Sequence, residues 1–172
     1  FARHCDVRNP ESVAMLATAI RKKFGRIDVL VNNAGIAHAL ATVDQLSVEA
    51  WREVIDTNLT GLFLVNRAVL PLMHSGSTII NNVSISAKVV FPGMDAYNAS
   101  KHGALGFTDT LREELRPRGI RVIGLLPGAT DTDIWQQFWP EAPREKMMSA
   151  ESIAAAVVAA LRLPANATVS HI

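Results

Sequence analysis

The sequence predicts an α/β fold in which a doubly wound parallel sheet lies between two layers of helices. Strand-forming and helix-forming segments alternate along its 172 residues, which is the pattern of linked β–α–β units. The strand-forming runs are mostly apolar and lack a clean alternation with polar residues, which is typical of strands covered on both faces. The length favours a single domain over residues 1–172.

The first helix is predicted from its end signals. Asn9 can cap it, Pro10 suits its first position, and Gly25 ends it after Phe24. The remaining elements follow from apolar runs and turn residues. We expect strands over 27–31, 78–83 and 120–126 with a last one near Thr168, and helices over 48–73, 94–115 and 150–161. The turn residues His74-Ser75-Gly76 are expected to close the second helix.

Composition excludes several classes of function. Seventeen basic and sixteen acidic residues nearly balance, and no basic run is present, so a nucleic acid is not an expected partner. The apolar runs fall short of the roughly 20 residues that a membrane span needs, and the N-terminus lacks a signal-peptide pattern. We therefore expect a soluble, cytoplasmic protein without a membrane association. Cys5 is the only cysteine and the five histidines lack ligand spacing, so no metal site is expected.

Polar and glycine residues follow three of the predicted strands. Asn32-Asn33-Ala34-Gly35 follows the first, Ser84-Ile85-Ser86 the second and Pro127-Gly128 the third. In open parallel sheets, ligands bind at the carboxyl ends of the strands. These three segments are therefore expected to line one crevice.

Tyr97 and Lys101 are four residues apart in a predicted helix, so their side chains project from one face. A free phenol has a pKa of about 10 and exchanges its proton poorly near neutrality, but a nearby ammonium favours the phenolate. Lowering this pKa by roughly 3 units would take about 4 kcal/mol, which a lysine and a positively charged ring in a partly dry cleft can supply. Taken alone, such a pair is more often a surface pair.

The neighbouring motifs change that interpretation. Tyr97-Asn98-Ala99-Ser100-Lys101 resembles the YxxxK signature of the short-chain dehydrogenase/reductase family, and Ser84 has the spacing of that family's catalytic serine. Asn32-Asn33-Ala34-Gly35 is similar to its NNAG motif, Asn58 to its catalytic asparagine, and Pro127-Gly128 with Thr132 to its PGxxxT segment. The resemblance covers nearly the whole chain and implies a Rossmann-like fold.

The resemblance implies a reaction. Hydride would pass between a nicotinamide cofactor and a ketone or secondary alcohol, a small-molecule substrate, while Tyr97 gives or takes the proton. Ser84 would bond the substrate oxygen, and Lys101 would lower the Tyr97 pKa and hold the nicotinamide ribose. Asn58 would hold a water that links Lys101 to solvent. Purely structural roles are the alternatives: Ser84 could be a turn serine, and Asn58 an asparagine that hydrogen-bonds locally.

The resemblance also implies cofactor contacts. Asp6 and Val7 would meet the adenine, and Gly35 would let the backbone pass close to the adenosine portion. The complete implied set is Asp6, Val7, Asn33, Ala34, Gly35, Tyr97, Lys101, Pro127, Gly128, Thr130 and Thr132. The amides of Asn32 and Asn33 could instead tie neighbouring strands together. The residues that distinguish NAD from NADP are not in this sequence, so the cofactor is NAD or NADP.

The chain departs from the family pattern before Phe1. The family's first strand, glycine-rich loop and second strand should precede this residue and are missing from the sequence. The loop holds the pyrophosphate, and the first strand pairs beside the strand at Ile27. We therefore expect an N-terminally truncated piece of a longer enzyme. The alternative is a catalytically silent fragment or scaffold that cannot bind the cofactor.

An apolar lid and a subunit interface complete the expectations. The family places a substrate-covering segment between Thr132 and Met148, and here it contains Trp135, Phe138 and Trp139. These rings could equally pin a surface loop to the domain. The helices over 48–73 and 94–115 correspond to those that pair between subunits in relatives, so a homodimer or homotetramer is expected.

Overall fold

The computed structural model describes residues 1–164, 167 and 169–172, so Thr168, near which a last strand was predicted, lies outside the described residues. The residues that follow it do extend the sheet, because Ser170 and Ile172 hydrogen-bond to the backbone of Gly124 and Leu126 and His171 forms a parallel bridge with Gly124. The predicted alternation of helices and strands is confirmed. In chain order the elements are α1 (Pro10–Phe24), β1 (Ile27–Asn32), α2 (Val48–Ile55), η1 (Asp56–Thr60), α3 (Gly61–Val69), η2 (Leu70–Leu72), β2 (Met73–Asn82), η3 (Ile85–Ala87), α4 (Asp95–Leu115), η4 (Arg116–Arg118), β3 (Arg121–Leu125), β4 (Thr130–Asp131), α5 (Trp135–Phe138), η5 (Arg144–Lys146), β5 (Met148–Ser149) and α6 (Ala150–Leu161).

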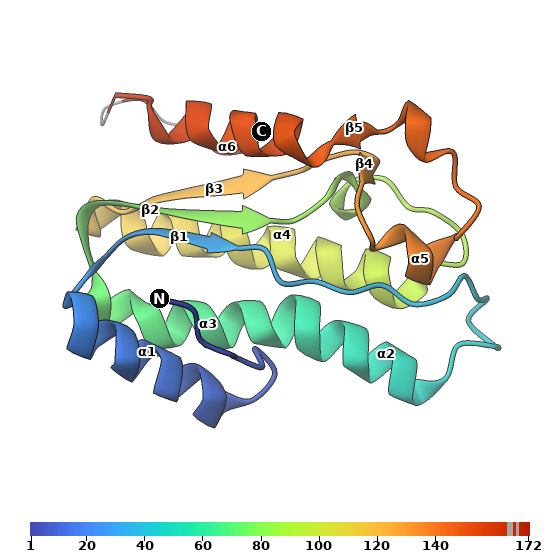
Figure 1. The fold of residues 1–172 in the computed structure, drawn as a ribbon, viewed down its shortest axis with the longest axis horizontal. Helices are drawn as coiled ribbons and strands as arrows, with labels where there is room; N and C mark the ends of the chain where they lie inside the picture. The colour runs from blue at the N-terminus through green and yellow to red at the C-terminus, as the bar shows by residue number, and fades with distance from the viewer. Residues whose placement is uncertain (165–166, 168) are drawn as a thin grey trace.

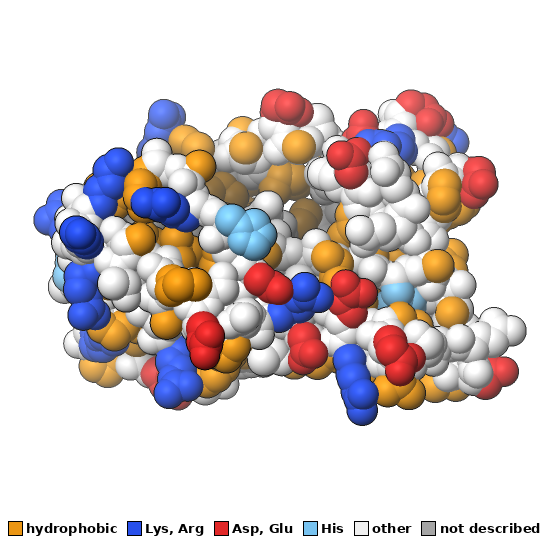
Figure 2. Space-filling view, turned by 60° about the horizontal axis from the view of Figure 1, so that its bottom comes forward, with side chains coloured by type: hydrophobic (Ala, Val, Ile, Leu, Met, Phe, Trp, Pro, Cys, Tyr) orange, Lys and Arg blue, Asp and Glu red, His pale blue; other side chains and the backbone are white. Residues whose placement is uncertain are grey.

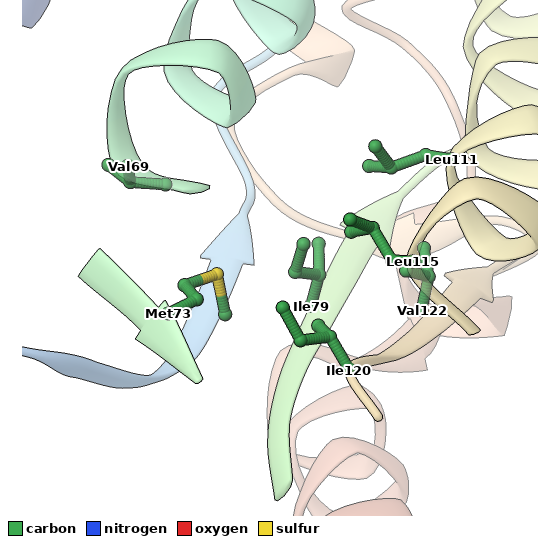
Figure 3. Close-up of a cluster of buried hydrophobic side chains, with 7 residues drawn as sticks. All are labelled: Val69, Met73, Ile79, Leu111, Leu115, Ile120 and Val122. Carbon is green, nitrogen blue, oxygen red and sulfur yellow. The ribbon is translucent and has the colours of Figure 1, made fainter. Parts of the chain in front are cut away.

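Three parallel strands in the order β1-β2-β3 form the middle layer. Helix α6 lies over one face of the sheet, and α3 and α4 lie over the other (Figure 1). Ile80 and Ile123 pack on Ala160 of α6. The core on the other face consists of Val69, Met73, Ile79, Leu111, Leu115, Ile120 and Val122 (Figure 3). The predicted three-layer α/β/α architecture with a parallel sheet is therefore confirmed.

Strand β1 is covered less completely than its apolar sequence suggested. Val29 and Val31 are 44% and 45% exposed. Val31 pairs with Ile80, so both valines lie on the face that α6 covers. The expectation of cover on both faces fails for these two side chains because α6 packs over β2 and β3.

Strand β2 begins earlier than predicted. Met73 already pairs with Ile27, whereas Val29 pairs with Thr78, so the residues between form a bulge. The predicted turn over residues 74–76 is thus part of β2. Gly76 takes a φ of +91° there and donates its backbone N–H to the Gly119 carbonyl. The helical region ends at Leu72 instead, with Pro71 in its last short turn.

The predicted helix over 48–73 is interrupted by a π-helical turn, η1. Ser47 caps its start by accepting a hydrogen bond from the Ala50 N–H. The π turn carries Asn58, which is only 4% exposed. Such turns within α-helices are frequent at functional sites. Within the described ranges, no helix combines the length and apolar character needed to cross a bilayer.

Charge is unevenly distributed on the face shown in Figure 2. Lys and Arg side chains gather toward its left end, where the strands begin in Figure 1, and acidic and basic side chains mix elsewhere. The last turn of α1 contributes Arg21, Lys22 and Lys23 to the basic residues of this chain. The strands end at the opposite side of the molecule (Figure 1).

Candidate active site

The carboxyl ends of β1 and β2 are tied together by paired asparagines. Asn32 Nδ2 donates to Asn81 Oδ1 at 2.8 Å, and Asn82 Nδ2 donates to Asn33 Oδ1 at 2.7 Å. Asn81 is fully buried and also donates to Thr108 Oγ1 at 3.0 Å. The amides of Asn32 and Asn33 therefore tie neighbouring strands together, as the structural interpretation of these residues predicted, and they fix the strand ends around the crevice.

Ser84 follows β2 in an unusual backbone conformation. Among the described residues it is the one non-glycine residue with a positive φ, at 118° with ψ at 153°. This region is essentially restricted to glycine, and occupying it costs of order 1–3 kcal/mol. The Ser84 hydroxyl accepts a hydrogen bond from the Ser86 N–H at 3.1 Å. Strain of this kind persists where the surroundings hold it in place, and it clusters at functional sites.

Helix α4 brings Tyr97 to the end of β2. Tyr97 is 8% exposed, and its phenol lies near the Ser84 side chain. Burial raises the pKa of the Tyr97 phenol, and the neighbouring Ser84 hydroxyl lowers it by a smaller amount. The net direction is opposite to the lowering that we expected from Lys101. The phenolate loses its hydration on burial, so the protonated form is favoured in the protein alone.

Lys101 lies one turn further along α4. It is 6% exposed, and its Nζ donates to the Asn82 carbonyl at 3.1 Å. The ammonium lies 5.4 Å from the centroid of the Tyr97 ring, over the ring face. Burial lowers the pKa of Lys101 to about 8, because the charged form loses its water. The site therefore holds a buried ammonium group whose pKa of about 8 is close to neutral pH.

The Asn58 amide joins three segments. Its Oδ1 accepts from the Ile36 N–H at 2.9 Å, and its Nδ2 donates to the Ile36 carbonyl at 2.9 Å and to Ser100 Oγ at 3.1 Å. Ser100 Oγ donates in turn to the Tyr97 carbonyl at 2.8 Å. Both ends of the amide are engaged by protein groups. Asn58 thereby fixes the segment after β1 against α4.

Gly35 lies beside the buried ammonium. A Cβ on this residue would be 3.4 Å from Asn58 Oδ1 and 3.6 Å from Lys101 Nζ. Asn33, Ala34 and Gly35 are all exposed. An accessible strip of backbone therefore runs past Lys101, as a nucleotide cofactor with a ribose beside a cation would require.

The aromatic residues of the expected lid lie in and beside α5. The Phe138 ring packs on Tyr97 in a T-shaped arrangement with centroids 4.8 Å apart, and Trp135 packs on Phe138 at 5.9 Å. Phe138 is 6% exposed, whereas Trp139 is 47% exposed. Two of the three expected rings are thus at or next to Tyr97, and Trp139 faces solvent.

The remaining expected cofactor contacts lie around this core. Pro127 is half-buried and accepts the Ile85 N–H through its carbonyl, and Gly128 is exposed. Thr130 lies in β4 and Thr132 directly follows that strand. Before α1, the half-buried Asp6 forms an ion pair with Arg8, which holds the pKa of its carboxyl below the usual range. Val7, which was expected with Asp6 to contact an adenine, packs closely against Gly61 at the start of α3.

A model of the short chain dehydrogenase family matches residues 1–143. The chain belongs to this family. The match includes the segments that contribute Gly35, Asn58, Ser84, Tyr97 and Lys101 to the site, so the family relationship and the geometry concern the same region.

Known short-chain dehydrogenases and reductases extend the comparison. A 3-oxoacyl-[acyl-carrier-protein] reductase of Synechocystis is 41% identical over 136 residues, which are 78% of this chain and 55% of that protein. The structure of an alcohol dehydrogenase from Thermococcus sibiricus with 5-hydroxy-NADP has a TM-score of 0.90 at 29% identity, covering 100% of this chain and 72% of that one. A 3-ketoacyl-(acyl-carrier-protein) reductase from Brucella melitensis with NADH has a TM-score of 0.86 at 28% identity, covering 98% and 74%.

These likenesses establish the Rossmann-like fold of the short-chain dehydrogenases for this chain. The chain spans about half the length of the first curated relatives that it matches. The fold shared with the solved structures covers nearly all of this chain but about three quarters of theirs.

Sequence reasoning missed three contacts in this short-chain dehydrogenase site. The Asn82 carbonyl accepts from Lys101, Ser100 links Asn58 to α4, and Gln137 accepts a hydrogen bond from the Ala37 N–H at 2.9 Å. A backbone carbonyl has no side-chain signal in the sequence. Gln137 and Ala37 are a hundred positions apart, and nothing in their local sequence relates them.

Proposed function

We propose that this protein is the catalytic part of an NAD- or NADP-dependent oxidoreductase that interconverts a ketone and a secondary alcohol. The observation that carries the proposal is the joint burial of Tyr97 and Lys101 on α4, with the Ser84 hydroxyl near the phenol. A buried acid, a buried cation and a positioned hydroxyl at the carboxyl end of a parallel sheet are the groups that carbonyl reduction needs.

In carbonyl reduction, Ser84 and Tyr97 would both donate hydrogen bonds to the substrate oxygen. The Tyr97 phenol is protonated at neutral pH because burial raises its pKa, so it carries the proton to be given. Negative charge grows on the substrate oxygen as the new C–H bond forms, and the Tyr97 proton moves to that oxygen. The Lys101 ammonium stabilises the phenolate that remains. Alcohol oxidation would follow the same steps in reverse.

A nicotinamide cofactor, when bound, would give or take the hydride. The exposed strip of Asn33, Ala34 and Gly35 would lie along it, with Lys101 at its ribose. The nicotinamide end of the cofactor would be lined by Pro127, Gly128, Thr130 and Thr132. The solved relatives were found with 5-hydroxy-NADP and with NADH, so the cofactor that we propose for this chain is NAD or NADP.

The aromatic cover over Tyr97 favours a substrate with apolar bulk. Phe138 and Trp135 would meet the substrate on the side away from the sheet.

We also propose that the protein acts as a homodimer or homotetramer through α2, α3 and α4. Trp51 and Phe63 on these helices are 40% and 44% exposed and would be covered in such an assembly.

The proposal is tested with the full-length protein as encoded by its gene. NADH or NADPH should bind, as followed by nicotinamide fluorescence, and one of them should be oxidised in the presence of apolar ketones. Cofactor binding without turnover of any ketone, alcohol or sugar would reject the oxidoreductase proposal. Absence of binding would favour a silent scaffold.

Ser84 offers a prediction that separates chemistry from stability. Ser84→Ala and Ser84→Gly should each lower kcat/KM by about a hundredfold, because both lose a donor to the substrate oxygen. Glycine adopts the observed φ of 118° without strain, so the glycine variant should be about 1 kcal/mol more stable than the alanine variant. Urea denaturation measures the difference. Equal stability of the two variants would show that the backbone at residue 84 is not strained.

A further inference from the structure

Residues 132–147, here called the flap, form a loop whose two ends are held together. Thr130 pairs with Met148 and Asp131 with Ser149, so β4 and β5 close the base of the flap. Trp135 Nε1 also donates to the Thr130 carbonyl at 2.8 Å. Helix α5 lies within the flap, at the side of the molecule where the strands end (Figure 1). The base is therefore fixed, and α5 connects the flap to the candidate site.

Helix α5 joins the candidate site through an apolar cluster that includes Phe138, Ala37 and Tyr97, and two of its contacts bear directly on Tyr97 and Ala37. Phe138 packs edge-to-face on the Tyr97 ring, with an interplanar angle of 84°. The neighbouring Gln137 is itself exposed, but its Oε1 accepts the Ala37 N–H at 2.9 Å. Ala37 is 8% exposed, so this donor has little access to water and depends on Gln137 for its partner.

Together with contacts of Asn58 and Ser100, these two contacts form a continuous chain that starts and ends at Tyr97. Ile36, which precedes Ala37, is held through both its N–H and its carbonyl by Asn58. Asn58 reaches α4 through Ser100, whose hydroxyl donates to the Tyr97 carbonyl. The position of the Ala37 N–H is therefore fixed relative to Tyr97. Because Gln137 accepts a hydrogen bond from this N–H, it holds the flap in a defined position relative to Tyr97.

We propose that Gln137 is a positioning residue that seats the flap, holding Phe138 over Tyr97 through its hydrogen bond with the Ala37 backbone. The inference rests on the proposed function for its catalytic meaning. Because Phe138 covers the Tyr97 ring, the proposal has this hydrogen bond open for substrate entry and re-form around the bound substrate. Closing the flap removes water from Tyr97, which strengthens the interactions of its proton.

The chain offers a rescue variant and a matched control. Gln137→Ala removes the acceptor, whereas Gln137→Glu keeps an oxygen that can accept from the Ala37 N–H. Gln136 is the adjacent residue of α5, is also exposed, and bonds within the flap to Asp133. Gln136→Ala therefore changes the same helix by the same number of atoms without touching the Ala37 contact.

The first readout is the ionisation of Tyr97, which requires neither cofactor nor turnover. Tyr97 is the single tyrosine of this sequence, and subtracting the ultraviolet titration of Tyr97→Phe isolates its signal in the full-length protein. Burial raises the pKa of this phenol. Gln137→Ala should let water reach Tyr97 and move its titration to lower pH, whereas Gln137→Glu and Gln136→Ala should titrate like the parent protein.

The second readout is steady-state kinetics. Gln137→Ala should raise KM about fivefold, the effect of losing one neutral hydrogen bond, with a smaller change in kcat. Gln137→Glu should restore KM. If Gln137→Ala and Gln136→Ala behave alike in both readouts, the proposal is overturned. If the titration shifts while every protein, including the parent, lacks oxidoreductase activity, the seating role of Gln137 stands and the proposed function fails.

Discussion

Replacing Tyr97 with phenylalanine should lower kcat/KM for carbonyl reduction by about a thousandfold, since a positioned general acid contributes about 10²–10⁴ in rate. The substitution removes only the hydroxyl and its interaction with the neighbouring Ser84 side chain. The ring keeps its edge-to-face contact with Phe138. We therefore expect the stability to change by no more than about 1 kcal/mol. Initial rates at saturating reduced cofactor, with a melting curve on the same sample, measure both quantities.

The control for this variant is cofactor binding. The exposed strip over residues 33–35 and the Lys101 ammonium are untouched, so NADH or NADPH should bind to Tyr97→Phe nearly as tightly as to the parent protein. A variant that binds cofactor and has lost turnover places the proton transfer at Tyr97. Retention of the full rate would instead remove Tyr97 from the chemistry and leave Ser84 as the polar group at the substrate oxygen.

Much of the fold was predictable because its signals are local. Asn9 accepts hydrogen bonds from two N–H groups of the first turn of α1, and Gly25 ends the helix at a φ of 77°, as the end signals predicted. The extent of β2 was not predictable. Its bulge is set by pairing with β1 and by the bond from Gly76 to Gly119, and these contacts form only between segments far apart in the sequence.

The candidate site divides in the same way. Ser84, Tyr97 and Lys101 could be identified as candidates from a motif, because the proposed chemistry requires those side chains at that spacing. The strain at Ser84 is a property of the backbone and leaves no signal in the residue type. In the protein alone the pKa of Tyr97 is raised, whereas we expected a lowering from Lys101 and a bound nicotinamide. The sequence placed a cation nearby but gave no measure of burial, and burial is the larger effect on this phenol.

Lys101→Met should abolish most of the activity while making the protein more stable at neutral pH. The ammonium is buried and its pKa falls from 10.5 to about 8. Below pH 8 the folded protein keeps this charge out of water, at a cost of up to about 3 kcal/mol relative to the unfolded chain. Methionine fills similar space without a charge and avoids that cost. Loss of the cation from Tyr97 should lower kcat/KM about a thousandfold.

The pH dependence of the stability identifies the cause. Between pH 8 and pH 10.5 the folded protein has released the Lys101 proton while the unfolded chain still binds it, so the free energy of unfolding contributed by this group rises with pH. The advantage of Lys101→Met should therefore be largest at pH 7 and nearly vanish by pH 10. Above pH 10 the raised pKa of Tyr97 acts in the opposite direction, because its phenolate is disfavoured in the folded protein.

Urea denaturation of the parent protein, Lys101→Met and Lys88→Met from pH 7 to pH 10 tests this account. Lys88 is exposed, so its replacement should leave the stability within about 0.5 kcal/mol at every pH. A Lys101→Met advantage that stays constant with pH would show that packing, rather than the buried charge, separates the two proteins. An advantage that fades with pH would show that the fold bears a stability cost to keep this cation beside Tyr97, as expected of a group retained for chemistry.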